Sequence, residues 1–258
     1  MLLAIDIENR TTNFGLFESD KMLANFTLAS SKDRSASELY LVIKYLLLDK
    51  KIDMDKIDDV IISSVVPELD KTYATIGENI IGKSPTFISA GLKIGINIKC
   101  DNPKDVGSDR IIRAVGARDR FKDDLIIISA STITTIDYIN SKKEFVGGLI
   151  MPGINLFQES LFKESAKLPQ VEIIKSEKIL GKTTTSAMQN GIYFAYKSAI
   201  ISIIDRIIDQ HKLDIKNTKI IISGEYNSLI QNEKYKLETI SNLGLYGLNK
   251  IYKLNMKK

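Results

Sequence analysis

The sequence predicts an α/β protein built from two related halves, and three observations lead to this prediction. Strand-like apolar runs alternate with helical runs along the 258 residues. The order strand, polar turn, strand, strand, helix occurs twice, and LLAIDIENRTTNFGLF and LIIISASTITTIDYI occupy equivalent places in the two copies. Both segments end a buried strand at a short polar turn rich in threonine. We therefore expect two sheets with flanking helices that face each other across a nucleotide cleft.

The first half begins with a meander of three strands and continues with alternating helices and strands. The segment 35–50 predicts a helix, because Ser35 and Glu38 have the spacing of a capping box. A second helix follows Pro67, with Leu69, Tyr73, Ile76 and Ile80 on one face. The expected strands are residues 1–6, 12–17, 22–28, 58–66 and 86–90.

The second half repeats this order after a helix over residues 107–121. A long apolar helix is expected over residues 184–210, and shorter ones after Gly153 and over 226–232. The expected strands are residues 124–130, 134–139, 144–150 and 218–224.

Composition excludes several classes of protein. Hydrophobic residues make up 44% and charged residues 26% of the chain, which is ordinary for a soluble globular protein. The net charge is +4 and basic residues are interspersed with acids, so we expect no nucleic-acid partner. With one cysteine, Cys100, neither an intrachain disulfide nor a cysteine metal cluster is possible. No apolar run approaches the ~20 residues of a membrane span, and we expect a cytoplasmic protein without a signal peptide.

The single histidine limits the available acid–base chemistry. His211 stands at the expected end of a helix, where a cation interacts favourably with the helix dipole. A histidine-dependent triad or a histidine-rich metal site is therefore not expected. Proton transfer has to come from Asp, Glu, Lys or Tyr side chains.

The segment GSDR, Gly107 to Arg110, has the chemistry of a substrate site. It opens a helix, and the free N–H groups of a first helical turn favour an anion. Arg110 offers a planar fork for a carboxylate. Asp109 is positioned to accept a proton from an attacking hydroxyl. The competing interpretation is a simple helix N-terminus with a surface arginine.

The turn after the first strand has the layout of a phosphate-binding hairpin. Asp6 ends the strand, and such a turn favours small residues that let backbone N–H groups approach phosphate oxygens. Here the apex carries Glu8 and Arg10 instead. Glu8 therefore either turns to solvent or to Arg10, or the loop does not bind a phosphate group.

The chain resembles the type III pantothenate kinases, members of the acetate and sugar kinase/Hsc70/actin superfamily. Nine segments carry the resemblance, in register: AIDIENRTTNFGLF (4–17), ISSVVPEL (62–69), NPKDVGSDRIIRAVGA (102–117), STITTID (131–137), FVGGLIMPGINL (145–156), AKLPQV (166–171), GKTTTSAMQNGI (181–192), IIISGE (220–225) and LGLYGL (243–248). The resemblance implies two actin-like (ribonuclease H-like) domains, residues 1–117 and 118–258, each with a mixed sheet. It also implies a homodimer, with the long helix at the dimer interface.

The activity that the resemblance implies is ATP-dependent phosphorylation of pantothenate to 4'-phosphopantothenate, the first step of coenzyme A biosynthesis. Asp109 would be the base, and the residues expected to hold pantothenate are Gly107, Ser108, Asp109, Arg110, Thr184 and Cys100. The residues expected at ATP are Asp6, Asn9, Arg10, Thr11, Thr12, Thr132, Thr134 and Gly224. Asp6 would hold Mg²⁺ through the nucleotide.

The departures from the family pattern cluster at the expected ligand sites. Glu8 and Ser131 replace glycines of the two phosphate hairpins, and Glu225 replaces a glycine on the adenosine side. Ser129 replaces a carboxylate that binds a monovalent cation (K⁺ or NH₄⁺) in the family, so we expect weak or absent cation dependence. In addition, Arg10 replaces a threonine and Cys100 a tyrosine. Two alternatives to the pantothenate kinase remain open: a non-catalytic binding or regulatory protein of the same fold, and a kinase acting on another small hydroxylated acid.

Overall fold

The computed structural model describes residues 1–256, and the chain divides into two compact units. The first unit joins residues 1–120 to the C-terminal segment that begins at Asn242, and the second contains residues 121–241. The expected division placed all of 118–258 in the second domain. In the structure, the segment from Asn242 belongs to the first unit instead, because the C-terminal helix packs on the helix that follows Gly107.

The first unit contains a mixed sheet with strand order β3-β2-β1-β4-β5. Its strands are β1 (Leu2–Ile7), β2 (Thr11–Glu18), β3 (Lys21–Ala29), β4 (Asp59–Ser64) and β5 (Thr86–Phe87). β1 runs antiparallel to β2 and parallel to β4, and β2 runs antiparallel to β3. The predicted meander is therefore confirmed, while β5 is shorter than the expected strand.

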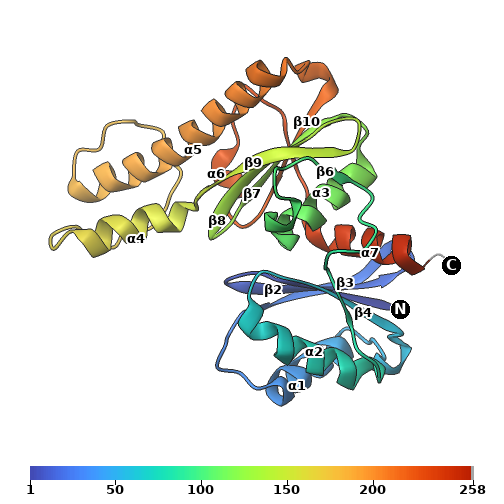
Figure 1. The fold of residues 1–258 in the computed structure, drawn as a ribbon. Helices are drawn as coiled ribbons and strands as arrows, with labels where there is room; N and C mark the ends of the chain where they lie inside the picture. Colours follow the sequence, from blue (N-terminus) through green and yellow to red (C-terminus); the bar gives the residue numbers. More distant parts are fainter. Residues whose placement is uncertain (257–258) are drawn as a thin grey trace. The chain divides into compact units, whose positions relative to one another are not determined.

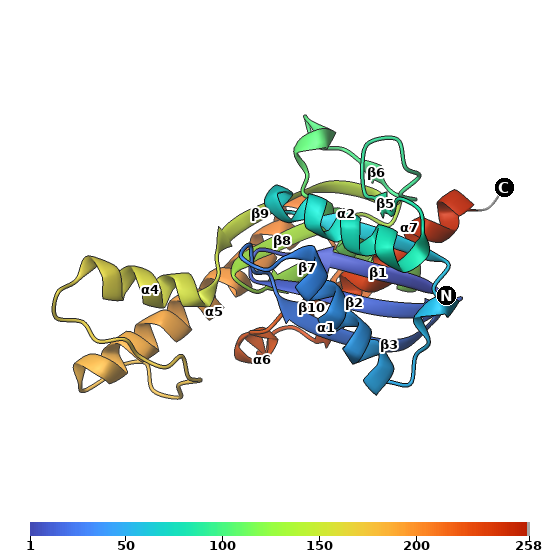
Figure 2. The ribbon, with the colours of Figure 1, turned by 90° about the horizontal axis from the view of Figure 1, so that it is seen from below.

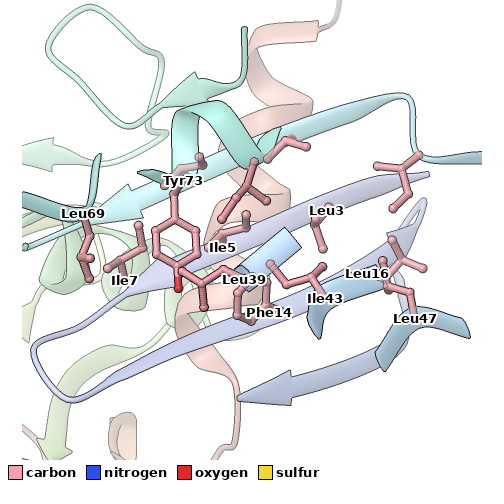
Figure 3. Packing of buried hydrophobic residues seen from close by; sticks show 14 of the residues in the cluster. Leu3, Ile5, Ile7, Phe14, Leu16, Leu39, Ile43, Leu47, Leu69 and Tyr73 are labelled. Carbon is pink, nitrogen blue, oxygen red and sulfur yellow. The ribbon is translucent and has the colours of Figure 1, made fainter. Parts of the chain in front are cut away.

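Two helices, α1 (Ala36–Asp49) and α2 (Pro67–Ile81), cover one face of this sheet. Figure 3 shows Leu3, Ile5 and Ile7 of β1 among the side chains that meet these helices. Helix α1 begins with the predicted capping box, because the Ser35 side chain accepts from Glu38 N–H and the Glu38 carboxylate accepts from Ser35 N–H. Alternation along β1 thus directs every second side chain into this core.

Helices α3 (Ser108–Arg120) and α7 (Leu243–Met256) cover the opposite face, where Leu2 and Ala4 of β1 are buried. The two helices touch backbone to backbone. A Cβ on Gly116 would lie 2.3 Å from the Leu243 carbonyl oxygen, and one on Gly247 would lie 1.8 Å from that of Ile112. Between β5 and α3 lie the short strand β6 (Asn97–Ile98) and a 3₁₀ turn, Pro103–Asp105.

The second unit repeats the topology of the first. Its strands are β7 (Asp124–Ala130), β8 (Ile133–Ile139), β9 (Glu144–Pro152), β10 (Thr218–Ser223) and β11 (Leu237–Thr239). They follow the order β9-β8-β7-β10-β11, with β7 antiparallel to β8 and parallel to β10. These five strands of the second unit follow the order of the first sheet, so the predicted α/β fold of two related halves is confirmed.

Helices α4 (Ile154–Glu164), α5 (Thr184–His211) and α6 (Asn227–Ile230) belong to the second unit (Figures 1 and 2). Tyr196 and Ile200 of α5 pack with Ile126 and Ile128 of β7 in its core. His211 is the last residue of α5, as expected, and its ring lies 4.7 Å from that of Tyr138. Among residues 1–256, no helix combines the length and apolar character that crossing a membrane requires.

Candidate functional site

The turn between β1 and β2 forms the first hairpin. It is closed by a hydrogen bond from Glu8 N–H to the Thr11 carbonyl at 2.9 Å. Asn9 and Arg10 are exposed at its apex. Thr12 is fully buried, and its hydroxyl is hydrogen-bonded to Ser30 Oγ at 2.8 Å. Residues 8–11 are therefore the part of this hairpin that can meet a ligand.

The carboxyl ends of the parallel strands β1 and β4 meet the first turn of α3. Asp6 of β1 lies opposite Ser63 of β4. Ser108 Oγ donates to the Ser64 carbonyl at 2.9 Å, and Ser63 Oγ donates to Ser108 Oγ at 3.0 Å. These bonds fix the start of α3, which carries the GSDR segment, at the carboxyl ends of β1 and β4, the end of the strands at which ligands bind in open α/β folds.

Arg113 links the hairpin to α3. Its Nη2 lies 2.5 Å from Glu8 Oε1 and its Nη1 lies 2.8 Å from Asp109 Oδ2. The residue is only 6% exposed. Burial lowers the pKa of Arg113, but Glu8, Asp109 and Asp6 outweigh this effect and raise it. We call Asp6, Glu8, Asp109 and Arg113 the arginine cluster, in which the guanidinium is charged throughout the physiological range.

Asp6 is the member of the arginine cluster with an unsatisfied oxygen. It is 3% exposed, and its Oδ1 has no hydrogen-bond partner. Burial, followed by the negative charge of Glu8, raises the pKa of Asp6 well above its usual value, although Arg113 opposes this shift. A buried, ionised carboxylate with an oxygen that accepts no hydrogen bond is destabilising on its own. Such an oxygen suits a cationic ligand.

We expect Asp6→Asn to raise the melting temperature by a few degrees at pH 8 and to weaken Mg-ATP binding. The pKa of Asp6 in the folded protein lies above that of the unfolded chain (~3.9), so the carboxylate lowers stability progressively as the pH rises above the unfolded value. Thermal melts at pH 5 and pH 8, with and without Mg-ATP, measure both effects. A variant that melts below wild type at pH 8 would contradict the prediction.

Asp6 gives the arginine cluster an oxygen that fits a cation carried by a nucleotide. Among the described residues, no group of three or more His, Cys, Asp or Glu side chains is arranged to hold a metal. Asp6 nevertheless supplies one unpaired carboxylate oxygen. Such an oxygen can interact with a divalent cation whose remaining ligands are phosphate oxygens and water, which is the usual mode for Mg²⁺.

Of the other residues expected to bind substrate, Gly107 and Arg110 lie at the start of α3, whereas Cys100 and Thr184 lie in other segments. The Gly107 carbonyl accepts from Ile111 N–H at 3.1 Å, and Arg110 is half-buried in the first turn. Cys100 is half-buried and follows β6. Thr184 is the exposed first residue of α5, whose N-cap is Thr183 rather than Thr184.

The turn between β7 and β8 forms the second hairpin. Ser131 and Thr132 occupy it, and Gly153 N–H donates to the Thr132 carbonyl at 3.1 Å. Thr134 is buried, with its hydroxyl 2.6 Å from the Tyr196 hydroxyl of α5. Ser131 and Thr132 are half-buried and Ile133 is exposed, so residues 131–133 are the part of this hairpin that can meet a ligand.

The turn after β10 lies directly beside the end of β7. Gly224 has φ +99°, and a Cβ there would lie 2.3 Å from the Ala130 carbonyl oxygen. Only glycine suits this place, since both the conformation and the close approach exclude a side chain. Glu225 follows it and is exposed, so its side chain is not buried in the sheet.

Ser129 occupies in the second sheet the position that Asp6 occupies in the first. Asp6 lies opposite Asn13 and Ser63, and Ser129 lies opposite Thr135 and Ser223. Ser129 is buried, and the neighbouring hydroxyl of Thr135 has no hydrogen-bond partner. The second hairpin therefore presents neutral hydroxyls where the first presents a carboxylate.

Sequence reasoning predicted Asp6 and Asp109 but missed Arg113, which joins the hairpin to α3. It offered solvent or Arg10 as the destination of Glu8, and the structure adds the pairing with Arg113. The signal was the spacing of Asp109 and Arg113, because residues four apart on a helix lie on the same face. Ser63 and Ser64 lie in the segment ISSVVPEL but were not assigned a role.

Comparison with known proteins identifies the family. The model of the type III pantothenate kinases matches residues 2–206. The chain is 35% identical over 257 residues to the type III pantothenate kinase of Geobacter sulfurreducens, which covers 99% of both chains. It is 36% identical over 255 residues to that of Dehalococcoides mccartyi, with 98% of both chains covered.

Solved structures share the fold. A Campylobacter jejuni protein described as a Baf family transcriptional activator superposes with a TM-score of 0.60 at 21% identity, over 98% of both chains. The activator of 2-hydroxyisocaproyl-CoA dehydratase from Clostridium difficile gives 0.55 at 12% identity, over 98% of this chain and 94% of that one. At these identities the likeness concerns architecture alone, and it is that of the actin-like ATPases and sugar kinases. Because its family model matches residues 2–206 and relatives at 35–36% identity cover nearly its whole length, the chain belongs to the type III pantothenate kinase family.

Proposed function

We propose that the protein transfers the γ-phosphoryl group of ATP to the primary hydroxyl of pantothenate, the first step of coenzyme A biosynthesis. The observation that carries this proposal is the arrangement of Asp109 beside Asp6. One carboxylate, held by Arg113, stands at the first turn of α3, and the other has an oxygen without a partner. A proton acceptor next to a cation-binding oxygen is what phosphoryl transfer to an alcohol needs.

Each predicted residue has a distinct role in this proposal. Asp109 accepts the proton of the attacking hydroxyl through the carboxylate that Arg113 orients. Arg110, in the same turn of α3, holds the substrate carboxylate. Gly107 and Ser108 form the start of the helix, and Thr184 and Cys100 contribute to pantothenate binding.

ATP would supply the phosphoryl group and Mg²⁺ would reduce the charge on its phosphates, with residues of each hairpin contributing to nucleotide binding. Asp6 would hold the cation through its unpaired oxygen, while Asn9, Arg10 and Thr11 belong to the first hairpin. Thr132 and Gly224 are placed at the second hairpin and the turn beside it. Thr12 and Thr134 support the hairpins from the core side, since their hydroxyls are bonded to Ser30 and Tyr196.

The experiment that tests the function is ATP-dependent phosphorylation by purified protein. ADP release should require pantothenate, and the product should carry one phosphate by mass spectrometry. Other small hydroxy acids, tested in parallel, address the replacement of tyrosine by Cys100. The pairing of Glu8 with Arg113 accounts for one of the departures that raised the non-catalytic alternative, and the assay tests the effect of the others, Ser131 and Glu225. ATP hydrolysis that is independent of every acid, or no turnover at all, would contradict the proposal.

We expect monovalent cations to change the rate by less than about threefold. Hard cations prefer charged oxygen ligands, and Ser129 supplies only a hydroxyl at the position where the family has a carboxylate. The measurement compares turnover in Na⁺, K⁺ and NH₄⁺ at constant ionic strength. Strong activation by K⁺ would show that other oxygens complete the site, and Ser129→Asp is the variant expected to increase it.

We also propose a cytoplasmic homodimer. The second unit exposes apolar side chains beyond its own core: Leu161, Phe162, Ile179 and Leu180. On α5, Ala195 is exposed, while Ile203 and Ile207 are only partly covered. Apolar surface of this kind is typical of an interface. Light scattering at micromolar concentration should give the mass of two chains, and a monomer mass would contradict the proposal.

A further inference from the structure

The Glu8–Arg113 pair joins two segments that are 105 positions apart in the chain. One end is the first phosphate hairpin and the other is the helix that carries the proposed base. The guanidinium uses one Nη for each carboxylate, at 2.5 Å to Glu8 and 2.8 Å to Asp109. An arginine in this position fixes the direction of both side chains, because its donors have a rigid planar geometry.

The pair is also part of a charge balance. Asp6, Glu8 and Asp109 supply three carboxylates around one guanidinium. The side chain of Arg113 is 7% exposed, whereas those of Glu8 and Asp109 are about one-fifth exposed (21% and 19%). The arginine is therefore the buried centre of the group. Without it, three like charges would face the place proposed for the nucleotide phosphates.

We propose that Glu8 and Arg113 act together as a positioning pair for the phosphoryl transfer. Glu8 holds Arg113 in place, and Arg113 in turn orients Asp109 and compensates the negative charge of the phosphate hairpin. This inference rests on the proposed kinase function and deepens it. Glu8 is thus a functional part of the loop, although its charge is opposite to the one expected next to phosphates.

The proposal predicts that the effect of Glu8→Gln depends on whether Arg113 is present. In the wild-type background, the neutral glutamine amide binds Arg113 more weakly than the Glu8 carboxylate does. We therefore expect kcat to fall about tenfold while ATP affinity changes less than about threefold. In the Arg113→Met background, Glu8 is an unpaired negative charge. There the same substitution should tighten ATP binding about tenfold and leave kcat unchanged.

The test is a cycle of four proteins: wild type, Glu8→Gln, Arg113→Met and the double variant. ATP affinity is measured by calorimetry with a non-hydrolysable analogue and Mg²⁺, and kcat and KM by ADP release. Equal effects of Glu8→Gln in both backgrounds would overturn the proposal. An inactive wild type whose binding cycle still shows the dependence would refute the kinase assignment but keep the charge compensation.

Arg113→Lys separates charge from geometry and serves as a second test if Arg113→Met does not fold. Lysine keeps the charge but lacks the planar fork. We expect ATP affinity within about threefold of wild type and a kcat about tenfold lower, with partial loss of the Glu8→Gln effect. A loss of ATP affinity without a change in kcat would contradict the assigned roles. The control is Arg120→Met, an exposed arginine on the same helix, ~10 Å further along its axis.

Discussion

Asp109→Asn is expected to lower pantothenate-dependent turnover by about 10²- to 10⁴-fold, the usual contribution of a general base. The amide is nearly isosteric with the carboxylate but cannot accept the hydroxyl proton at neutral pH. Its carbonyl oxygen can still accept from Arg113 Nη1, which lies 2.8 Å from Asp109 Oδ2. Fold and ATP affinity should therefore be little changed, and the loss should appear in kcat.

The matched control is Asp119→Asn on the same helix. Asp119 is exposed and pairs with Lys250 at 2.5 Å, away from the arginine cluster. A surface ion pair of this kind contributes about 0–1 kcal/mol to stability, so turnover and melting temperature should hardly change. If Asp109→Asn keeps wild-type kcat while the control behaves as expected, Asp109 is not the base.

Gly247→Ala is expected to lower the free energy of unfolding by about 2 kcal/mol or more, and the melting temperature by about 4–8 °C. The new Cβ would lie 1.8 Å from the Ile112 carbonyl oxygen and 2.6 Å from its carbon. Both are backbone atoms of α3, so the helices have to separate. This cost exceeds the gain of up to ~1 kcal/mol that alanine brings to a helix interior.

Gly191→Ala in α5 is the control for this prediction. A Cβ there would meet no atom within 4 Å. The substitution should therefore stabilise the protein by ~0.5–1 kcal/mol, through helix propensity alone. Denaturant titrations of both variants provide the comparison. A Gly247→Ala protein as stable as Gly191→Ala would show that α3 and α7 do not depend on their backbone contact. A lower kcat in Gly247→Ala would further indicate that α7 holds α3, and with it Asp109, in place.

The strands and most helices were predictable because their residues obey local rules. Apolar runs bounded by polar turns defined β1 and β2, and the capping box defined the start of α1. Helix α7 was not predicted, because Gly244 and Gly247 lower the helix propensity of its first two turns. Those glycines are required by the close approach of α3, and such a tertiary contact leaves no local pattern in the sequence.

The candidate site was predictable in part. Asp6 and Asp109 stand at element ends, which motif reasoning recognises. Thr12 and Thr134 were expected at ATP, yet their hydroxyls face the cores of the two units. Strand periodicity carries this information, since Thr12 shares a face with Phe14, and Asn13 lies opposite Asp6. Arg113 depends on a contact between distant segments, for which only its spacing from Asp109 gave a signal.

Helix α7 has a consequence for how the chain is synthesised. The first unit contains residues 1–120 and the segment from Asn242, so the ribosome makes the whole second unit before α7 emerges. At ~5–20 residues per second, this delay is roughly 7–30 s. During that time Leu2, Ala4 and Ile112, which pack with Leu245 and Leu248 in the finished protein, lack their cover. The nascent N-terminal unit therefore exposes an apolar surface that chaperones can bind. A chain released early, without α7, is prone to aggregation and proteolysis.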